Sequence, residues 1–178
     1  MNFVEKTVSK DYKFHGRIMQ IRVDDALLPN GEPCIREVCE HPDGVGVLAI
    51  AEDRTVTLVR QYRYPYGEVI LEIPAGKKDH GPENAEQCAR RELAEETGLL
   101  AGEMIPMGEV WPSPGFMDER VFLFCAKQLT QGELHPDEDE FVEVVKMPFE
   151  ELCRLVADGE IKDAKTVAAV GKALLLGL

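Results

Sequence analysis

The sequence lacks the marks of several protein classes. Its five cysteines form no C-x-x-C pair and are odd in number, so we expect neither a zinc site nor a disulfide framework. No apolar run approaches the roughly 20 residues that a membrane-spanning helix needs. Residues 1–6 lack the basic-then-apolar order of a signal peptide. We therefore expect reduced thiols, no membrane partner and a cytoplasmic location.

Basic residues are also scarce. The 178 residues include 20 Lys and Arg against 33 Asp and Glu, which gives a formal net charge of −13. A nucleic-acid binder needs a basic face to displace the counterions around phosphates, so we expect no nucleic-acid partner. An acidic protein can still bind an anionic small molecule when divalent cations lie between the two. A hydrophobic content of 44% is ordinary for a folded chain of this length.

Apolar runs and turn residues predict a β-rich first half followed by mixed structure. Strands are expected at two or three places within residues 3–26, over 45–51, 55–60 and 69–73, and near 104–111, 120–127 and 141–147. Helices are expected from about Pro82 to Thr97 with Gly98 as the stop, from Pro148 to about Asp158, and after Asp163. No repeat or linker interrupts this order, which predicts a single α+β domain with the first 40 residues as an extension.

Three glutamates near the end of the first predicted helix share one stripe. At about 100° per residue, Glu92, Glu95 and Glu96 fall together, beside an apolar stripe that includes Ala89 and Leu93. Like charges four residues apart cost about 0.2–0.5 kcal/mol, and the negative end of the helix dipole disfavours anions by roughly 0.3–1 kcal/mol each. A solvated acidic face is one interpretation. The other is a hard divalent cation bound by the carboxylates, which would remove both penalties.

The segment that holds these glutamates resembles the Nudix box, G-x5-E-x7-R-E-U-x-E-E-x-G-U, where U is apolar. Residues 91–99 match its second half at every fixed position, and seven residues separate Glu83 from Arg91, as the box requires. One departure exists: six residues rather than five separate Gly76 from Glu83, so the loop before the helix is one residue longer.

The resemblance implies a metal-dependent hydrolase of compounds that contain a nucleoside diphosphate. The resemblance implies Glu92 and Glu96 as the main ligands of Mg²⁺ or Mn²⁺, and the Ala75 backbone carbonyl as another. Glu95 would be either a further ligand or a residue that acts on the metal through another ligand. Gly76 gives the backbone the tight path that leaves this carbonyl available. Arg91 lies one helical turn before Glu95 and can hold that catalytic carboxylate, while Glu83 helps to orient the ligands. The cations would neutralise a diphosphate and activate a water.

Segments outside the box resemble the ADP-ribose pyrophosphatase group of this family. Residues 113–119 resemble its S-P-G-x-x-D-E segment, residues 60–63 its R-Q-Y-R strand end, and residues 159–166 also look like it. The substrate-binding residues that we expect are Arg36, Arg63, Pro114, Gly115 and Glu119. The fork-like guanidinium groups of the two arginines suit a phosphate or a terminal ribose. The other interpretations are exposed surface arginines and a rigid turn between strands.

An acidic run over residues 135–140 is a further candidate. It lacks the glycine and the downstream glutamate of an EF-hand loop, and a solvated loop is the ordinary interpretation of such a run. In the resembling enzymes an acidic loop at this place supplies the general base and another metal contact. Matching by position suggests Glu138 as the base and Glu140 as the ligand, although neighbouring acids could exchange these roles.

The sequence as a whole thus predicts a Nudix α/β/α sandwich with a mixed sheet over residues 41–178. Residues 1–40 would form an N-terminal β-strand extension that, by analogy with the group, takes part in a homodimer. The expected reaction is hydrolysis of ADP-ribose to AMP and ribose 5-phosphate. One alternative is another nucleoside diphosphate sugar, such as GDP-mannose or ADP-glucose. A second alternative is a non-catalytic ADP-ribose sensor, against which the three crowded carboxylates argue.

Overall fold

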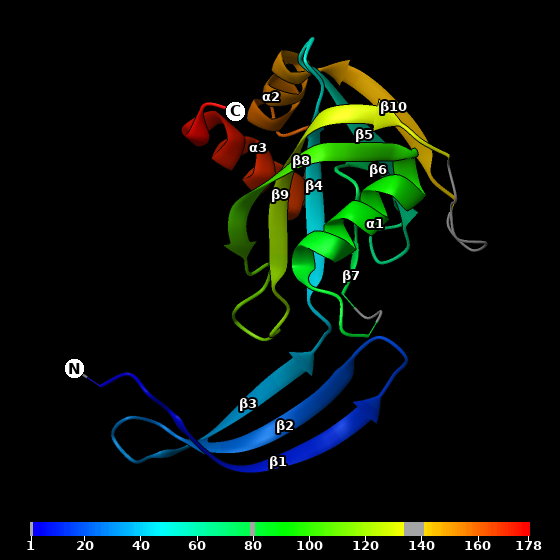
Figure 1. Cartoon of the computed structure of the whole chain (residues 1–178). Helices are drawn as coiled ribbons and strands as arrows, with labels where there is room; N and C mark the ends of the chain where they lie inside the picture. The colour runs from blue at the N-terminus through cyan, green and yellow to red at the C-terminus, as the bar shows by residue number, and fades with distance from the viewer. Residues whose placement is uncertain (1, 79–80, 134–140) are drawn as a thin grey trace. The chain divides into compact units, whose positions relative to one another are not determined.

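The computed structural model describes residues 2–78, 81–133 and 141–178, and the chain forms two units (Figure 1). The small unit consists of Met1–Pro42 and Trp111–Arg120, and the large unit of Asp43–Val110 and Val121–Leu178. The division at residue 40 that the sequence suggested stays a prediction. None of the helices in the described residues has the length and hydrophobicity of a membrane-spanning segment.

The small unit is a three-stranded antiparallel sheet. Its strands follow one another in space as in sequence: β1 (Lys6–His15), β2 (Gln20–Leu27) and β3 (Pro33–Glu40). Gly31 lies in the turn between β2 and β3, where its amide donates to the Leu28 carbonyl and its φ is 89°. Residues of the 111–120 segment bond to the end of β3, where the Cys39 amide donates to the Phe116 carbonyl over 2.7 Å.

The large unit contains a seven-stranded mixed sheet. Its strands are β4 (Gly44–Ile50), β5 (Thr55–Arg63), β6 (Glu68–Glu72), β7 (Ala75–Lys77), β8 (Leu99–Val110), β9 (Val121–Gln131) and β10 (Glu143–Pro148). The main order is β10-β5-β4-β9-β8, with β6 beside β5 and β7 beside β4. Strand β4 runs parallel to β9 and antiparallel to β5, and all its residues are buried, as an apolar run in a central strand requires.

Helices cover both faces of this sheet: α1 (Ala85–Thr97) on one, α2 (Phe149–Ala157) and α3 (Ala164–Leu176) on the other. Because side chains alternate along a strand, β4 contributes to two cores. Val45, Val47 and Ala49 pack with α1, whereas Leu48 and Ile50 pack with α2 and α3. The α/β/α sandwich and its mixed sheet are therefore confirmed.

The predicted helix ends are close to those in the structure. Asn84 caps α1 in a capping box with Gln87, so the helix begins at Ala85, later than the Pro82 start that the sequence suggested. Gly98 ends α1 in the left-handed conformation with a φ of 69°. Strand β8 begins directly afterwards at Leu99, five residues before the expected start near 104, because its first residues pair with the end of β9.

Candidate active site

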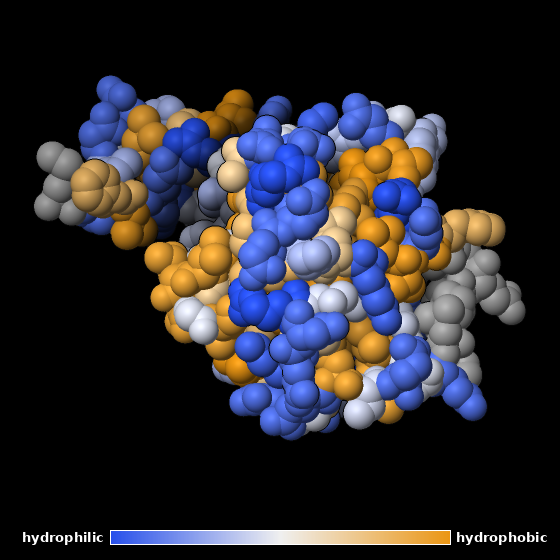
Figure 2. Space-filling view, turned by 90° about the horizontal axis from the view of Figure 1, so that it is seen from above, coloured by the Kyte–Doolittle hydropathy of each residue, from blue (hydrophilic) through white to orange (hydrophobic). Residues whose placement is uncertain are grey.

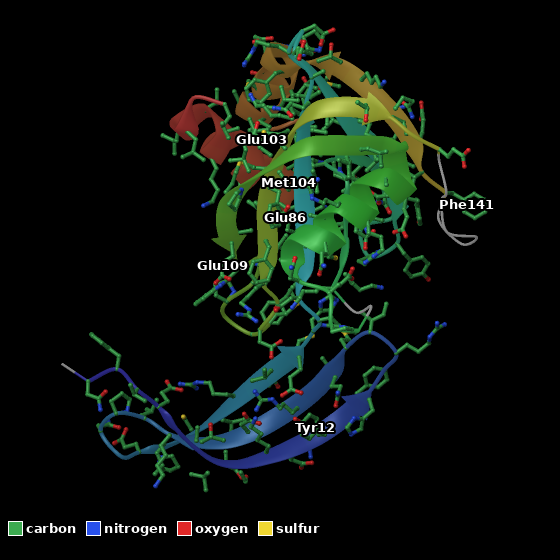
Figure 3. All side chains as sticks on the ribbon, viewed as in Figure 1. Tyr12, Glu86, Glu103, Met104, Glu109 and Phe141 are labelled. Atoms are coloured by element: carbon green, nitrogen blue, oxygen red, sulfur yellow. The ribbon has the colours of Figure 1, made fainter. Side chains whose placement is uncertain are left out.

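The acidic stripe of α1 is buried rather than solvated. Glu92 is 8% exposed and Glu96 is 3% exposed, beside the fully buried Ala89 and Leu93 that face the core. Glu86, on the first turn of the same helix (Figure 3), lies at the surface and pairs with Arg90. A solvated acidic face is therefore the wrong interpretation for Glu92 and Glu96. Carboxylates at such burial need partners, because desolvation disfavours their charged form.

Glu96 meets the strand that the Nudix-like motif assigns to metal binding. The Ala75 amide donates to its Oε2 over 2.9 Å. In the β4–β7 pair, the Val47 amide bonds to the Pro74 carbonyl and the Lys78 amide to the Asp43 carbonyl. Because hydrogen-bonding residues alternate in an antiparallel pair, both backbone polar groups of Ala75 are directed away from β4. The Ala75 carbonyl therefore lies on the same side as the Glu96 carboxylate.

Gly76 makes room for the second buried glutamate. A Cβ built on Gly76 would lie only 1.9 Å from Cδ of Glu92 and 2.0 Å from its Oε1. Any side chain at position 76 would therefore displace the Glu92 carboxylate. The requirement for glycine here comes from this close approach of backbone and carboxylate, because Gly76 is not among the residues of positive φ.

Arg91 joins the remaining carboxylates of the motif. Its guanidinium lies 2.9 Å from Oε1 of Glu83, 2.8 Å from Oε2 of Glu95 and 2.9 Å from Oε1 of Glu92. The contact to Glu95 is the one that the helical spacing predicted, and Glu83 acts on the cluster through Arg91. Burial lowers the pKa of Arg91, but the Glu83 hydrogen bond and the surrounding negative charge outweigh burial and raise it.

The donor chemistry of this cluster fits a hard divalent cation. Carboxylates and a backbone carbonyl are the oxygen ligands that Mg²⁺ and Mn²⁺ prefer, and the space that Gly76 leaves is occupied by a carboxylate. In the structure a guanidinium lies among these oxygens. No group of three or more His, Cys, Asp or Glu side chains in the described part of the chain is arranged to hold a metal. The ligand set Ala75, Glu92, Glu95 and Glu96 therefore stays a prediction.

Arg63 belongs to a second cluster, which sequence reasoning missed. Its Nε and Nη2 donate to the two oxygens of Glu72 over 2.8 and 2.9 Å, and Lys165 of α3 contacts the same carboxylate. Burial lowers the pKa of Arg63, but the hydrogen bonds and charge of Glu72 raise it above its ordinary value, with a smaller contribution from Glu96. The sequence feature that could have indicated this cluster is Glu72, the single charged residue inside the apolar run 69–73.

The small unit carries the other substrate-binding candidates. Arg36 donates to Glu5 through Nε over 2.8 Å, and Glu119 lies 3.4 Å from Nδ1 of His41. Pro114 and Gly115 lie in a turn where the Met117 amide donates to the Ser113 carbonyl over 2.9 Å. The turn that we considered for these two residues is therefore present. Glu138 and Glu140 lie outside the described residues.

The family follows from a comparison with known proteins. Residues 40–170 match the model described as NUDIX domain, which covers most of the chain. The chain belongs to the Nudix family. Its α1 with the preceding strand β7 is thus the Nudix motif, and the longer loop between Gly76 and Glu83 is a variation within the family.

Curated relatives of this Nudix protein cover nearly the whole chain. It is 42% identical to the ADP-ribose pyrophosphatase of Bacillus subtilis (strain 168), over 93% of this chain and 90% of the relative. It is 41% identical to the methanol dehydrogenase activator of Bacillus methanolicus, over 94% and 91% of the two chains. A solved structure titled ADP compounds hydrolase has the same fold, with a TM-score of 0.87, 22% identity, and coverage of 99% and 96%.

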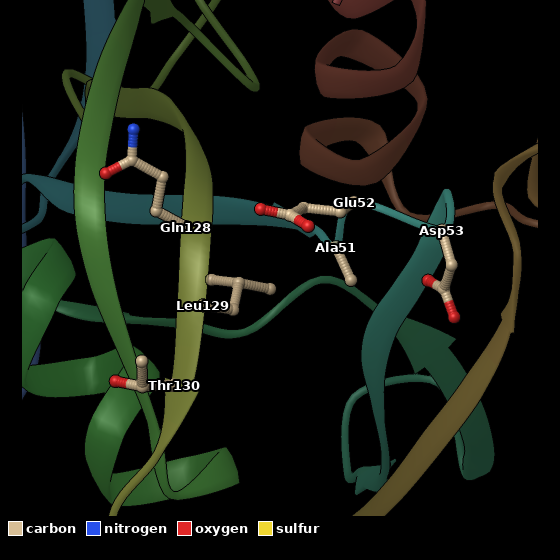
Figure 4. Close-up of a pocket in the computed structure, with 6 residues that line it drawn as sticks. All are labelled: Ala51, Glu52, Asp53, Gln128, Leu129 and Thr130. Atoms are coloured by element: carbon tan, nitrogen blue, oxygen red, sulfur yellow. The ribbon is translucent and has the colours of Figure 1, made fainter.

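A separate hollow of about 470 Å³ lies elsewhere in the large unit of this Nudix protein. Its lining comes from the turn after β4 and from β9 (Figure 4): Ala51, Glu52, Asp53, Gln128, Leu129 and Thr130. This lining includes none of the residues of the Nudix motif. The hollow therefore lies apart from the acidic residues of the Nudix motif.

Proposed function

We propose that this Nudix protein hydrolyses ADP-ribose to AMP and ribose 5-phosphate with Mg²⁺ or Mn²⁺. The observation that carries the proposal is the buried pair Glu92 and Glu96 at the end of α1, beside the Ala75 backbone. Two like charges one helical turn apart in a buried place are costly unless cations neutralise them. The 42% identity to an ADP-ribose pyrophosphatase supports the substrate.

In the proposed reaction the residues of the motif bind and orient. Glu92, Glu96, Glu95 and the Ala75 carbonyl would hold the cations. Bound cations would neutralise the diphosphate and would lower the pKa of a water. Hydrolysis joins the oxygen of a water to one phosphorus and breaks the bond from this phosphorus to the bridging oxygen, so the two products together contain the substrate plus one water. Arg91 would hold Glu95 in place throughout, as its 2.8 Å contact to that carboxylate suggests.

The remaining roles also stay proposals. Arg63 would bind the diphosphate, and Arg36, Pro114, Gly115 and Glu119 would contribute to the rest of the substrate site. Glu138 would accept the proton of the attacking water and Glu140 would add a metal contact. A guanidinium suits a phosphate because it donates two parallel hydrogen bonds to it.

The test is a panel of substrates. The protein is incubated with ADP-ribose, ADP-glucose or GDP-mannose and millimolar Mg²⁺, and the products are separated by anion exchange. We expect AMP and ribose 5-phosphate, with the highest kcat/KM for ADP-ribose. Faster turnover of GDP-mannose would contradict the proposed substrate. Binding of ADP-ribose in calorimetry without turnover of any compound would contradict the enzyme and favour a sensor.

We further propose a homodimer and a cytoplasmic location. The small unit leaves large apolar side chains of its strands exposed, among them Val8, Phe14 and Ile35, which a second copy would cover. Figure 2 shows that hydrophobic side chains also remain among hydrophilic ones on the face in view. All five cysteines are free thiols, which a reducing compartment maintains. Light scattering after gel filtration tests the dimer, and a monomeric mass would contradict it.

A further inference from the structure

Among the described residues outside the Nudix motif, Glu72 has the most completely buried carboxylate. It ends β6, three residues before Ala75, and is 1% exposed. Both oxygens are used: Oε1 accepts from Arg63, and Oε2 accepts from Arg63 and from Lys165. Two cations on one buried carboxylate compensate for its desolvation, which a single weak partner would not.

The pair with Glu72 fixes the orientation of the Arg63 guanidinium. Two parallel hydrogen bonds to one carboxylate hold the planar fork in a single plane, because Nε and Nη2 lie on the same edge. Nη1 lies off this edge, and among the described residues it donates to none. The side chain of Arg63 as a whole is 37% exposed. The charge of Glu96 also acts on Arg63, which places the guanidinium within electrostatic reach of the Nudix glutamates.

Helix α3 completes the surroundings of Glu72. Lys165 also pairs with Asp163 over 3.0 Å, and Asp163 caps the helix through the Thr166 amide over 2.9 Å. The Thr166 hydroxyl accepts from the Ile73 amide over 2.9 Å, so the start of α3 is fastened to the residue that follows Glu72. The carboxylate therefore sits in a frame that leaves it little freedom to move.

We propose that Glu72 is a positioning residue, which holds Arg63 so that Nη1 faces the anionic diphosphate of the substrate. This proposal rests on the proposed function, because it needs a diphosphate at the Nudix glutamates. A buried ion pair adds little net stability compared with apolar packing. What the Arg63–Glu72 pair provides instead is a fixed orientation of the Arg63 guanidinium. Lys165 shares Oε2 with Arg63, but its ammonium group is a compact charge that has no plane for the carboxylate to orient.

The test is a double-mutant cycle between Glu72→Gln and Arg63→Lys, measured with ADP-ribose and saturating Mg²⁺. Arg63→Lys keeps the charge but loses the fork. We expect each single variant to raise KM about tenfold and to change kcat by no more than about twofold, because binding rather than chemistry loses an interaction. If Glu72 acts through Arg63, the double variant has the same KM as Arg63→Lys alone.

A matched control is Glu143→Gln, which removes the carboxylate from another Arg–Glu pair of strand β5. Glu143 lies opposite Arg60 in the β10–β5 register, 2.8 Å from its guanidinium, and is exposed. We expect wild-type KM and kcat from this control. An increase in KM equal to that of Glu72→Gln would overturn the proposal, because the effect would then belong to any such pair.

Other outcomes of the cycle also have defined consequences. A double variant whose KM increase is the product of the two single increases would overturn the proposal, as would Glu72→Gln with a lower Tm and unchanged KM. If Glu72→Gln fails to fold, the cycle is repeated with Glu72→Asp, which keeps the charge but shortens the side chain. A wild-type protein that turns over no nucleotide sugar instead contradicts the proposed function, before any variant is compared.

Discussion

Helices α1 and α2 are both rich in acidic residues, but they place them in opposite ways. In α2, Glu150 and Glu151 occupy the first turn, where the helix dipole favours anions, and Arg154 lies in the last turn. Each acid has its own exposed partner, Glu150 with Arg54 and Glu151 with Arg154, both at 2.8 Å. The hydrogen bonds from these arginines lower the pKa values of Glu150 and Glu151.

In α1 the acids of the Nudix motif lie where the helix dipole or burial disfavours them. Glu95 and Glu96 occupy the last turn, which contains no basic residue, and Glu92 and Glu96 are buried. Arg91, the guanidinium that lies among the acids, already contacts three carboxylates. Local rules thus account for the acids of α2 but not for those of α1. The comparison teaches that acidic residues on a helix indicate a function only where they are buried and lie at the negative end of the helix dipole.

The largest expected effect is on turnover. Glu92→Gln or Glu96→Gln should lower kcat by at least about 10²-fold, because each replaces a charged oxygen ligand by a neutral one. Removing one of two like charges should leave the Tm equal or slightly higher. The measurement is ADP-ribose hydrolysis together with a thermal melt. Glu151→Gln on α2 is the control and should keep wild-type turnover, while near-normal rates in the α1 variants would refute the metal assignment.

The next largest effect is expected on stability, when the guanidinium of Arg91 is removed from α1. Arg91→Met leaves three carboxylates without their shared cation at a position that is only 23% exposed, so the free energy of unfolding should fall by about 2 kcal/mol. Urea titrations with a chelator present measure this. Arg154→Met removes a comparable set of contacts on α2, where the arginine is 51% exposed, and its denaturation midpoint should stay unchanged. Equal decreases in the free energy of unfolding of both variants would contradict the proposed difference between α1 and α2.

Adding or removing Mg²⁺ should also distinguish α1 from α2, because only variants of α1 should lose the Mg²⁺-dependent increase in Tm. A ligand that binds only the folded state at a hundred times its Kd stabilises by about 2.7 kcal/mol. Mg²⁺ should therefore raise the Tm of the wild type and of Glu151→Gln, and EDTA should reverse the increase. The double variant Glu92→Gln, Glu96→Gln should show no shift. A Mg²⁺-dependent shift that survives this double substitution would mean that the ion binds elsewhere.

The smallest expected effect concerns the cysteines of the two helices. Burial raises the pKa of Cys88 on α1 from its ordinary value of 9.0 to about 12, and Cys153 on α2 is only half-buried. A folded-state pKa above the unfolded one means that the contribution of Cys88 to stability is complete below pH 9.0 and declines as pH rises toward 12. Unfolding titrations from about pH 8 to about pH 10 should therefore show a shallower decline in Cys88→Ala.

A reactivity measurement checks the same contrast. At mildly alkaline pH, iodoacetamide should modify Cys153 before Cys88 in the native protein, because the thiolate is the reacting form and burial suppresses it at Cys88. Peptide mass spectrometry distinguishes the two sites. Modification of Cys88 at the faster rate would show that the buried face of α1 opens more readily than its packing indicates.

Much of the fold and of the motif could be predicted from the sequence. The caps at Gly98, Pro148 and Asp163 mark helix ends by local chemistry, and all three are confirmed. The contact between Arg91 and Glu95 follows from the four-residue spacing of a helix. The exact start of β8 could not be predicted, because it depends on pairing with residues of β9 about 30 positions away.

The sequence by itself determined which carboxylates lie on one stripe of α1, since helical geometry is set by neighbours along the chain. Only the tertiary structure decided that Glu92 and Glu96 are buried, that Gly76 approaches Glu92, and what surrounds Glu72. The contact of Glu72 with Lys165 joins residues 93 positions apart, and that with Arg63 depends on the register of β5 with β6. Such contacts arise from how a sheet is ordered and covered by helices, which no local spacing specifies.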